Sequence, residues 1–494
     1  MTSAKNLLII MSDEHAADAL GCAGHPHVMT PTLDALAARG TRFSNAYTPS
    51  PICVPARAAF HTGHAVHQTG YWSSAQPYDG RMSTWGHAVR ATGRDCVSIG
   101  KLHFRSTADD NGFSPEILPM HVMDGIGWSE SLLRDPMPDY SVHARELADD
   151  VGRGESSYTA YDRAITQATC DWLSNRANTN AADGQKPWTL FVSLVSPHYP
   201  LSAPEDFFDL YDPAKMNLPR HAEGHLDHPI LAEMRDFWCY GDYFDEARSR
   251  AGRAAYYGLI SFLDANIAKI LDALDRSGAA GETDILYTSD HGELLGNHGF
   301  WTKSLMYEES VRVPMILAGR DLQCRGEVCE APVSLLDLYP TVLEAMAAMD
   351  GPNTDNTSSR HTNTARSLGR SLYRTLAQPD PDRTILSEYH DGGSPTGFFM
   401  VRWQRWKFIY YVGARPQLFD LVSDPYEEND LGTDRDHADV RDEGERRLRV
   451  ILDPEAVNTR AFADQRAKLE SYGGRDGLAD MVKFNHTPVP TIDG

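Results

Sequence analysis

Acidic residues follow two apolar runs of the sequence at points where buried strands are expected to end. The run "LLIIMSDEH" reaches Asp13 and Glu14, and the run "ILYTSDHGE" reaches Asp290 and His291. Because the carboxyl ends of central strands meet at one edge of a sheet, we expect these four side chains to converge. Each acid alone would suit a helix cap or a solvated turn. Together, three carboxylates and an imidazole favour a site for calcium, magnesium or manganese.

Basic residues and histidines lie near the same expected edge. Lys101 and His103 come directly after one strand and, at a spacing of two, point the same way. His198 follows another strand, and Lys303 comes shortly after the second acidic strand end. Taken singly, each is better explained as a surface charge or a loop histidine. Grouped with Arg57 around a carboxylate metal site, they predict binding of a tetrahedral oxyanion.

A lone cysteine precedes a proline and an arginine in "TPSPICVPARAAFHTG", residues 48–63. Pro55 suits the first turn of a helix, and Gly63 is expected to end it. Cys53 therefore lies at a helix N-terminus, where free N–H groups favour negative charge. Its thiol could be an activated nucleophile, or it could be a small buried residue beside the helix. These residues alone leave both interpretations open.

Strand and helix patterns alternate through the first two thirds of the chain. We expect buried strands at 6–11, 95–100, 188–196, 283–290 and 312–319. We expect helices at 31–39, 161–175, 251–278 and 332–347. Continuous apolar strands alternating with helices predict an α/β fold, in which helices sandwich a large, mostly parallel sheet.

The composition changes at residues 350–367, which are polar and indicate a linker or a long surface loop. Beyond it, 397–412 and 416–431 have the pattern of antiparallel hairpin strands, followed by a helix near 438–452. The last forty residues are expected to form an extended tail packed on the body. We therefore predict an α/β catalytic domain over 1–370 and a smaller C-terminal α+β domain with an antiparallel sheet over 371–494.

The charge balance and the cysteine spacing bear on the partners, the location and the structural sites to expect. With 46 Lys and Arg against 69 Asp and Glu, the 494-residue chain has a formal charge of −23. We therefore expect no nucleic-acid or membrane partner. A well-hydrated surface is the favoured explanation of the acidity, and a mild preference for cationic substrates is the alternative. The apolar run Leu7–Met11 is too short for a signal segment, so a cytoplasmic location is expected. Neither disulfide nor zinc spacing is evident among Cys22, Cys53, Cys96, Cys170, Cys239, Cys324 and Cys329.

The stretch "CVPAR" resembles the sulfatase signature Cys-x-Pro-x-Arg, and other segments occur in the order typical of that family. These segments are "KNLLIIMSDEH", "GKLHF", "SPHYP", "SDHGELLGNHGFWTKSLMYEESVRVPMILAG" and "WKFIYYVGARPQLFDLVSDPYEENDL". The resemblance covers roughly residues 5–433 and implies the alkaline phosphatase-like fold. Glu14 stands where many arylsulfatases have Asp, and His291 where many have Asn. The Asp290-His291 version resembles the choline-sulfatase-like and phosphonate monoester hydrolase-like branches. The segments "GKLHF" and "SEYHDGGSPTGFFMVR" favour the choline-sulfatase-like branch, although the C-terminal tail does not resemble that of choline sulfatases.

The resemblance implies a cofactor chemistry and a maturation partner. Cys53 would be oxidised to formylglycine by a formylglycine-generating enzyme, with Arg57 supporting the modified side chain from one helical turn away. One divalent cation would be held by Asp13, Glu14, Cys53, Asp290 and His291. Calcium is the first choice, and manganese is the alternative because a histidine is among the ligands.

The implied reaction is hydrolysis of a small-molecule sulfate ester, aryl or alkyl, to an alcohol and sulfate. The hydrated aldehyde at position 53 would attack sulfur while Lys101 and Lys303 neutralise the sulfate oxygens. His198 would protonate the leaving alcohol, and His103 would take the proton that allows the aldehyde to return.

Two other functions stay open at this point. A phosphonate monoester or phosphodiester hydrolase would use the same residues, and a non-catalytic anion-binding protein would keep Cys53 unmodified. The substrate pocket is also open, because four aromatic residues near the motifs suit either a pocket for an aryl or quaternary ammonium group or the ordinary core. They are Tyr71, Trp72, Trp128 and Trp301. A homo-oligomer is only weakly expected.

Overall fold

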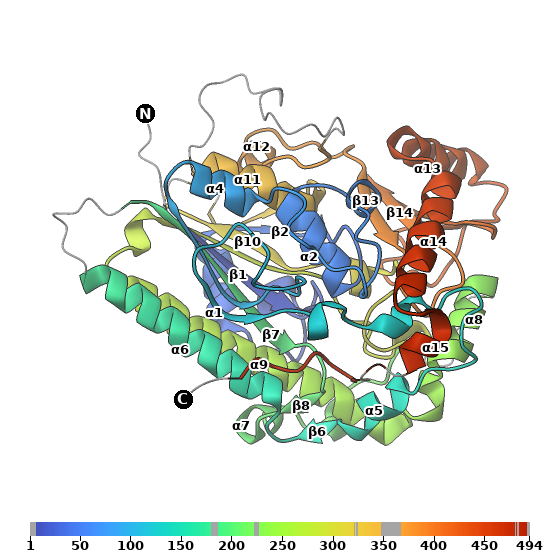
Figure 1. The fold of residues 1–494 in the computed structure, drawn as a ribbon, viewed down its shortest axis with the longest axis horizontal. Coiled ribbons are helices and arrows are strands. Elements are labelled where there is room, and N and C mark those ends of the chain that lie inside the picture. The colour runs from blue at the N-terminus through green and yellow to red at the C-terminus, as the bar shows by residue number, and fades with distance from the viewer. Residues whose placement is uncertain are drawn as a thin grey trace.

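An eight-stranded sheet forms the centre of the molecule (Figure 1). The computed structural model describes residues 6–178, 186–221, 227–320, 322, 325–346, 367–479, 481 and 484–491. The strand order is β11-β2-β10-β9-β1-β7-β4-β5. The bounds are β1 Asn6–Asp13, β2 Thr41–Phe43, β4 Asp95–Lys101, β5 Glu116–Met120, β7 Trp188–Pro197, β9 Thr283–Ser289, β10 Met315–Ala318 and β11 Glu327–Cys329. Only β10 runs antiparallel to its neighbours, so the prediction of a mostly parallel sheet is confirmed.

Helices cover both faces of this sheet (Figure 1). One face packs against α1 (Pro31–Arg39), α6 (Ser157–Asn178) and α9 (Glu246–Arg276). The other packs against α2 (Cys53–Thr62), α4 (Trp85–Ala91), α11 (Leu338–Ala345) and α12 (Leu372–Ala377). Shorter helices are α3 (Val66–Thr69), α5 (His143–Asp149), α7 (Glu205–Phe208), α8 (Pro229–Trp238) and α10 (Glu308–Val311). Among the described residues, no helix combines the length and hydrophobicity of a membrane span.

The central strand β1 shows why the sheet needs two helical layers. Leu8 and Ile10 belong to the cluster on the α6 and α9 face. Leu7, Ile9 and Met11 belong to the cluster on the α2 and α4 face. Side chains alternate across a strand, so a run that is apolar at every position buries both faces. The run therefore ends in the interior, and this places Asp13 at a buried sheet edge.

A four-stranded antiparallel sheet follows in the C-terminal part, in the order β13-β14-β15-β16. Its strands are β13 Ile385–Tyr389, β14 Phe398–Trp403, β15 Trp406–Tyr411 and β16 Gln417–Asp420. Helix α13 (Ala438–Ile451) packs on it through Leu448, as the sequence predicts. The fold class is thus confirmed. The division at residue 370 stays a prediction, and residues 350–366 of the expected linker lie outside the described residues.

The expectation of an extended tail over the last forty residues is wrong for most of that length. Residues 454–479 form α14 (Pro454–Ser471) and α15 (Gly474–Ala479). The side chain of Asp453 accepts a hydrogen bond from the Ala456 N–H, and Pro454 occupies the first turn. Ala461 is buried against the antiparallel sheet, so packing stabilises a helix that has little amphipathic pattern. Of the described residues, only 484–491 are extended along the body.

One smaller prediction also needs correction. The segment 332–347 was expected to be a single helix, but it begins with strand β12 (Val333–Ser334), which pairs with β3 (Ala46–Tyr47). The hydroxyl of Ser334 then accepts a hydrogen bond from the Leu336 N–H and starts the helical part. A serine inside an apolar segment thus marks a helix start here.

A partly buried ion pair links helix α3 to the antiparallel sheet. His67 of α3 contacts Glu388 of β13, with 2.8 Å between Nδ1 and Oε1. Burial alone would raise the pKa of Glu388, but His67 lowers it to about 2. Burial alone would lower the pKa of His67, but Glu388 raises it. Each group therefore favours the charged form of the other.

Replacing Glu388 with glutamine is expected to lower the free energy of unfolding by about 3 kcal/mol at pH 6. A raised folded pKa on His67 means that its contribution is complete below its unfolded pKa and is lost as pH rises through the folded value. The cost of Glu388→Gln should therefore shrink between pH 6 and pH 9. Urea unfolding at both values measures it, with Asp135→Asn in an exposed pair as the control. An equal cost at both pH values would contradict the pairing.

Candidate active site

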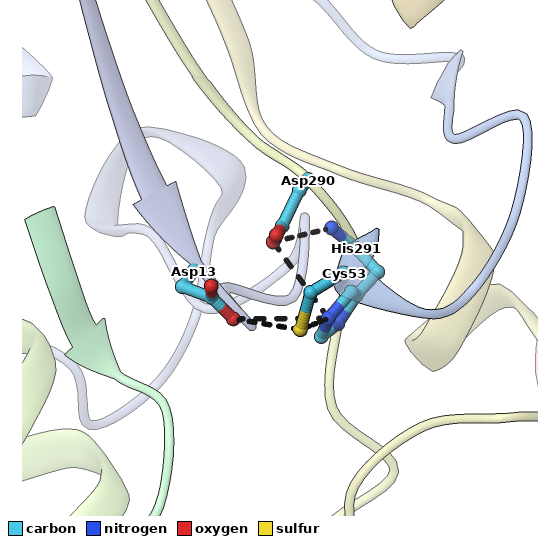
Figure 2. Close-up of side chains that lie close together, drawn as sticks. All are labelled: Asp13, Cys53, Asp290 and His291. Atoms are coloured by element: carbon cyan, nitrogen blue, oxygen red, sulfur yellow. Dashed lines mark hydrogen bonds and ion pairs between the residues drawn. The ribbon is translucent and has the colours of Figure 1, made fainter. Parts of the chain in front are cut away.

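Strands β1 and β9 bring two of the predicted acids to the N-terminus of α2, where Cys53 is the first residue (Figure 2). Asp13 ends β1, and Asp290 and His291 directly follow β9. Cys53 Sγ lies 3.0 Å from His291 Nε2 and 3.5 Å from Asp13 Oδ1. One potential ligand atom from each of these four buried residues lies within 4.8 Å of the others. Two carboxylates, one imidazole and residue 53 thus fit around a single cation.

Glu14 faces a different part of the site. Its backbone has φ of 68°, and its Oε2 lies 3.0 Å from Lys303 Nζ and 3.4 Å from His198 Nε2. A second potential metal group therefore consists of Asp13, Glu14 and His198. The predicted ligand set is thus divided between two neighbouring groups that share Asp13, and the metal role of Glu14 stays a prediction.

Arg57 holds the carboxylates of the site. Its Nε donates to Asp290 Oδ2 at 2.8 Å, and its Nη2 donates to Asp13 Oδ2 at 3.0 Å. Its Nη1 donates to the Lys101 carbonyl and the Ser193 hydroxyl. The residue lies one helical turn after Cys53, as expected, and its side chain bonds both acids, a backbone carbonyl and a serine hydroxyl. Arg57 thus fixes one oxygen of each carboxylate, and Asp13 Oδ1 remains directed toward Cys53.

Lys101 ends β4, His103 follows it, and the two residues serve different parts of the site. Lys101 Nζ lies 2.6 Å from Asp13 Oδ2, so this oxygen receives two cationic partners. His103 Nε2 lies 2.9 Å from the hydroxyl of Thr487, far along the chain. Burial and the charge of Lys101 lower the pKa of His103. The neutral ring keeps a buried Nδ1 that has no hydrogen-bond partner among the described residues.

Lys303 and His198 form a hydrogen-bonded pair. Lys303 Nζ lies 2.8 Å from His198 Nε2, and His198 Nδ1 lies 2.6 Å from the Tyr199 carbonyl. Because an ammonium group only donates, His198 Nε2 is the acceptor and Nδ1 carries the proton. Burial and Lys303 both lower the pKa of His198. The proton between Lys303 Nζ and His198 Nε2 therefore belongs to Lys303.

A cavity of about 90 Å³ opens onto Cys53, His198 and Lys303. Aromatic residues, histidines included, form much of its lining, and sequence reasoning identified three of them, His103, Trp128 and His198. Those it missed are His143, Tyr158, Tyr199, Trp238, Phe484 and His486. The adjacency of Tyr199 to the "SPHYP" histidine was the one local signal that could have indicated it.

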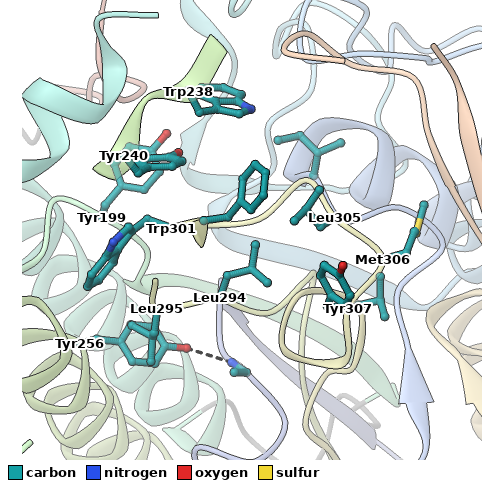
Figure 3. Close-up of a cluster of buried hydrophobic side chains, with 14 of the residues drawn as sticks. Tyr199, Trp238, Tyr240, Tyr256, Leu294, Leu295, Trp301, Leu305, Met306 and Tyr307 are labelled. Carbon is teal, nitrogen blue, oxygen red and sulfur yellow. Dashed lines mark hydrogen bonds between the residues drawn. The ribbon is translucent and has the colours of Figure 1, made fainter. Parts of the chain in front are cut away.

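Three of the four aromatic pocket candidates belong to the core instead. Trp301 stacks on Phe244 with ring centroids 4.1 Å apart, within the buried cluster of Figure 3. Trp72 donates its indole N–H to Asp464 of α14, and Tyr71 donates its hydroxyl to Asp79. All three are almost fully buried, and none lines the cavity. Proximity in sequence to a motif did not distinguish a pocket residue from a core residue.

Comparison with known proteins agrees with this geometry. A sulfatase family profile matches residues 5–348, and a profile for the C-terminal part of N-sulphoglucosamine sulphohydrolase matches residues 296–453. A choline-sulfatase of Rhizobium meliloti (strain 1021) is 31% identical over 441 residues, which cover 87% of this chain and 83% of the relative. The chain belongs to the sulfatase family.

The resemblance inferred from the motifs is thereby confirmed, and the sulfatase is a sulfuric ester hydrolase. An arylsulfatase K of Bos taurus is 29% identical over 444 residues, covering 86% of this chain and 77% of the relative. The fold also matches that of the phosphonate monoester hydrolase of Agrobacterium radiobacter, with a TM-score of 0.70 at 22% identity over 90% of this chain and 95% of the other. The alternative of a non-catalytic anion-binding protein is not retained.

The environment of Cys53 bears on its chemistry in this sulfatase. The side chain is 4% exposed, and burial together with Asp13 raises the pKa of its thiol. These effects outweigh the helix N-terminus, so the unmodified residue is a neutral thiol. The interpretation as an activated thiolate nucleophile is therefore not supported.

Proposed function

We propose that this sulfatase hydrolyses aryl or alkyl sulfate esters with a formylglycine made from Cys53 and one divalent cation. The observation that carries the proposal is the position of residue 53. It lies against Asp13 and His291 on one side and lines the cavity next to Lys303 on the other. A nucleophile at this point would meet both the cation site and the bound substrate.

The donor set fits the proposed cofactors. Asp13, Asp290, His291 and residue 53 would hold the cation, with calcium as the first choice and manganese as the alternative. A bound cation would lower the pKa of an oxygen on residue 53, and formylglycine would supply a hydrated aldehyde with two hydroxyls. Arg57 and Lys101 orient the carboxylate of Asp13, and Arg57 also orients that of Asp290.

The remaining side chains have separate tasks. Lys303 would bind a sulfate oxygen and, with His198, would hold the proton that the leaving alcohol needs. The unpartnered Nδ1 of His103 would accept a proton from residue 53 when the sulfate is released. Trp128, Tyr158 and Tyr199 would exclude water from the cavity.

A phosphonate monoester or phosphodiester hydrolase remains the second candidate, because phosphonate monoester hydrolases share this fold. Esters of both classes carry one negative charge on a tetrahedral centre, so Lys303 and the cation site would serve either. Because the charge is the same, the two candidate functions have to be distinguished by the turnover of the two classes of ester.

Two measurements test the proposal together. The mass and hydrazide reactivity of the peptide that carries residue 53 should show formylglycine. The kcat/KM for 4-nitrophenyl sulfate should exceed that for the matched phenylphosphonate ester by about tenfold or more. An unmodified thiol in active protein, from a host that has the modifying enzyme, would exclude the formylglycine mechanism. A preference for the phosphonate would favour the second candidate.

The proposal extends to maturation and location. A formylglycine-generating enzyme would be the maturation partner, reading the "CVPAR" segment before the chain folds. The cytoplasm is the proposed compartment, and the free state of six cysteines among the described residues supports a reducing one.

A further inference from the structure

The C-terminal segment 484–487 forms one wall of the active-site cavity. Phe484, Asn485, His486 and Thr487 line the same cavity as Cys53. In Figure 1 this segment is the dark red trace that runs from α15 toward α6. No step of the proposed reaction uses its side chains, although one of them contacts a proposed catalytic histidine.

The segment is anchored through its backbone. The hydroxyl of Tyr158, near the start of α6, donates to the Thr487 carbonyl at 2.8 Å. The rings of Tyr158 and His486 meet edge to face, with centroids 4.9 Å apart. Tyr158 and Thr487 are both buried. Because the anchoring bond uses a main-chain carbonyl, a substitution of the Thr487 side chain leaves its acceptor in place.

The Thr487 side chain makes a separate contact, with the imidazole of His103. Its hydroxyl lies 2.9 Å from His103 Nε2. The backbone of His103 is fixed independently, because its N–H donates to the Met120 carbonyl of β5 at 2.9 Å. The backbone bond does not determine which ring nitrogen carries the proton. Among the described residues, Thr487 provides the one hydrogen bond that the ring makes.

The two ring nitrogens of His103 have different surroundings. Nδ1 is buried and has no hydrogen-bond partner among the described residues. A proton on Nδ1 would therefore be a buried donor without an acceptor, which is costly. A proton on Nε2 is instead donated to the Thr487 hydroxyl. Because the hydrogen bond at one ring nitrogen sets the tautomer, Thr487 favours the ring with its proton on Nε2.

We infer that Thr487 is a positioning residue, whose hydroxyl accepts the Nε2 proton of His103 and so keeps the lone pair of Nδ1 free. The inference deepens the proposed function and rests on it for its kinetic test. In the proposed release of sulfate, Nδ1 receives a hydroxyl proton from residue 53. The O–H electron pair forms the carbonyl, and the electron pair of the C–O bond leaves with the sulfate. Attack on the ester does not use this lone pair, so Thr487 should affect release alone.

The kinetic test separates ester cleavage from sulfate release in the mature enzyme with its cation. After rapid mixing with 4-nitrophenyl sulfate, Thr487→Val should release one equivalent of 4-nitrophenol at the parent rate. It should then turn over about tenfold more slowly than the parent. Thr487→Ser keeps a hydroxyl and should restore most of the turnover. The matched control is Thr491→Val, the same substitution at an exposed threonine further along the chain, and it should behave like the parent.

A role of Thr487 in packing alone would give a different pattern. Loss of packing would slow the first turnover and the later ones together, and a serine would not restore them. Equal slowing of both phases in Thr487→Val would therefore overturn the inference. Unchanged turnover in Thr487→Val, or failure of Thr487→Ser to restore it, would do the same.

A second test does not depend on turnover. Precursor protein with Cys53 as a thiol is labelled with isotopic nitrogen in its histidines. Long-range proton–nitrogen correlations, assigned with His103→Gln, then show which ring nitrogen of His103 carries the proton. The parent and Thr487→Ser should have it on Nε2, and Thr487→Val should gain a population with it on Nδ1.

The two tests distinguish failure of the inference from failure of the proposed function. The expected tautomers in a protein without sulfate turnover would reject the proposed function and keep the inference. A proton on Nδ1 in the parent, or an unchanged tautomer in Thr487→Val, would reject the inference.

Discussion

Replacing Cys53 with serine is expected to lower kcat by on the order of 10⁴-fold or more and to leave the enzyme sulfated. A serine hydroxyl can attack sulfur, but it lacks the second hydroxyl through which a hydrated aldehyde expels the sulfate. The variant should therefore react once and stop. Intact mass after exposure to 4-nitrophenyl sulfate should show the addition of one SO₃ group, and steady-state assays should show the loss of turnover.

The control for this experiment is Cys170→Ser, the same substitution at a free cysteine on α6. It should retain full turnover and should gain no mass. Sustained turnover in Cys53→Ser would contradict the formylglycine mechanism, because it would show that sulfate is released from residue 53 without the aldehyde.

Removing the cation is expected to abolish activity without unfolding the protein. Arg57 and Lys101 remain paired with Asp13, and Arg57 also remains paired with Asp290, so the empty site keeps its charge balance. Because the cation binds only the folded chain, an excess of about 100-fold over its Kd should stabilise that chain by about 2.7 kcal/mol. Chelation should accordingly lower Tm, and readdition of calcium or manganese should show which cation restores both Tm and activity.

Asp290→Asn separates the cation effect from other effects of chelation. It should lower kcat/KM by on the order of 10³-fold, and its Tm should no longer respond to the cation. The matched substitution Asp212→Asn, in an exposed pair with Lys215, should change neither property. An Asp290→Asn protein whose Tm still rises with the cation would place the metal elsewhere.

Local patterns were sufficient for the strands that build the site. The run Leu7–Met11 is apolar at every position, and both of its faces are indeed buried. Such a run predicts a central strand, and a central strand predicts where Asp13 must lie. The helix α14 was missed because its apolar residues are too few for a helical pattern, although Asp453 and Pro454 already formed a helix start.

The candidate site was predictable in its residue types and much less so in its contacts. The residues chosen at strand ends, among them Asp13, Lys101 and Asp290, lie at the same sheet edge, because strand ends determine that edge, whereas Cys53 and Arg57 reach it from helix α2. The partners of Arg57 and Lys303 come from distant parts of the chain, and no local pattern specifies them. The same holds for the wall that contains Asn485 and Thr487, because nothing in "NHT" distinguishes a pocket wall from a surface turn.

The burial of Cys53 has a consequence during synthesis of the chain. His291, which contacts its sulfur, is made 238 residues later. A ribosome that adds about 5–20 residues per second needs roughly 10–50 s to cover that distance. An enzyme that must reach Cys53 in an extended peptide therefore has only this time to act. Cys53 becomes inaccessible to it once β9 has left the ribosome and paired with β1. The fraction of modified protein should consequently fall wherever elongation outpaces the modifying enzyme.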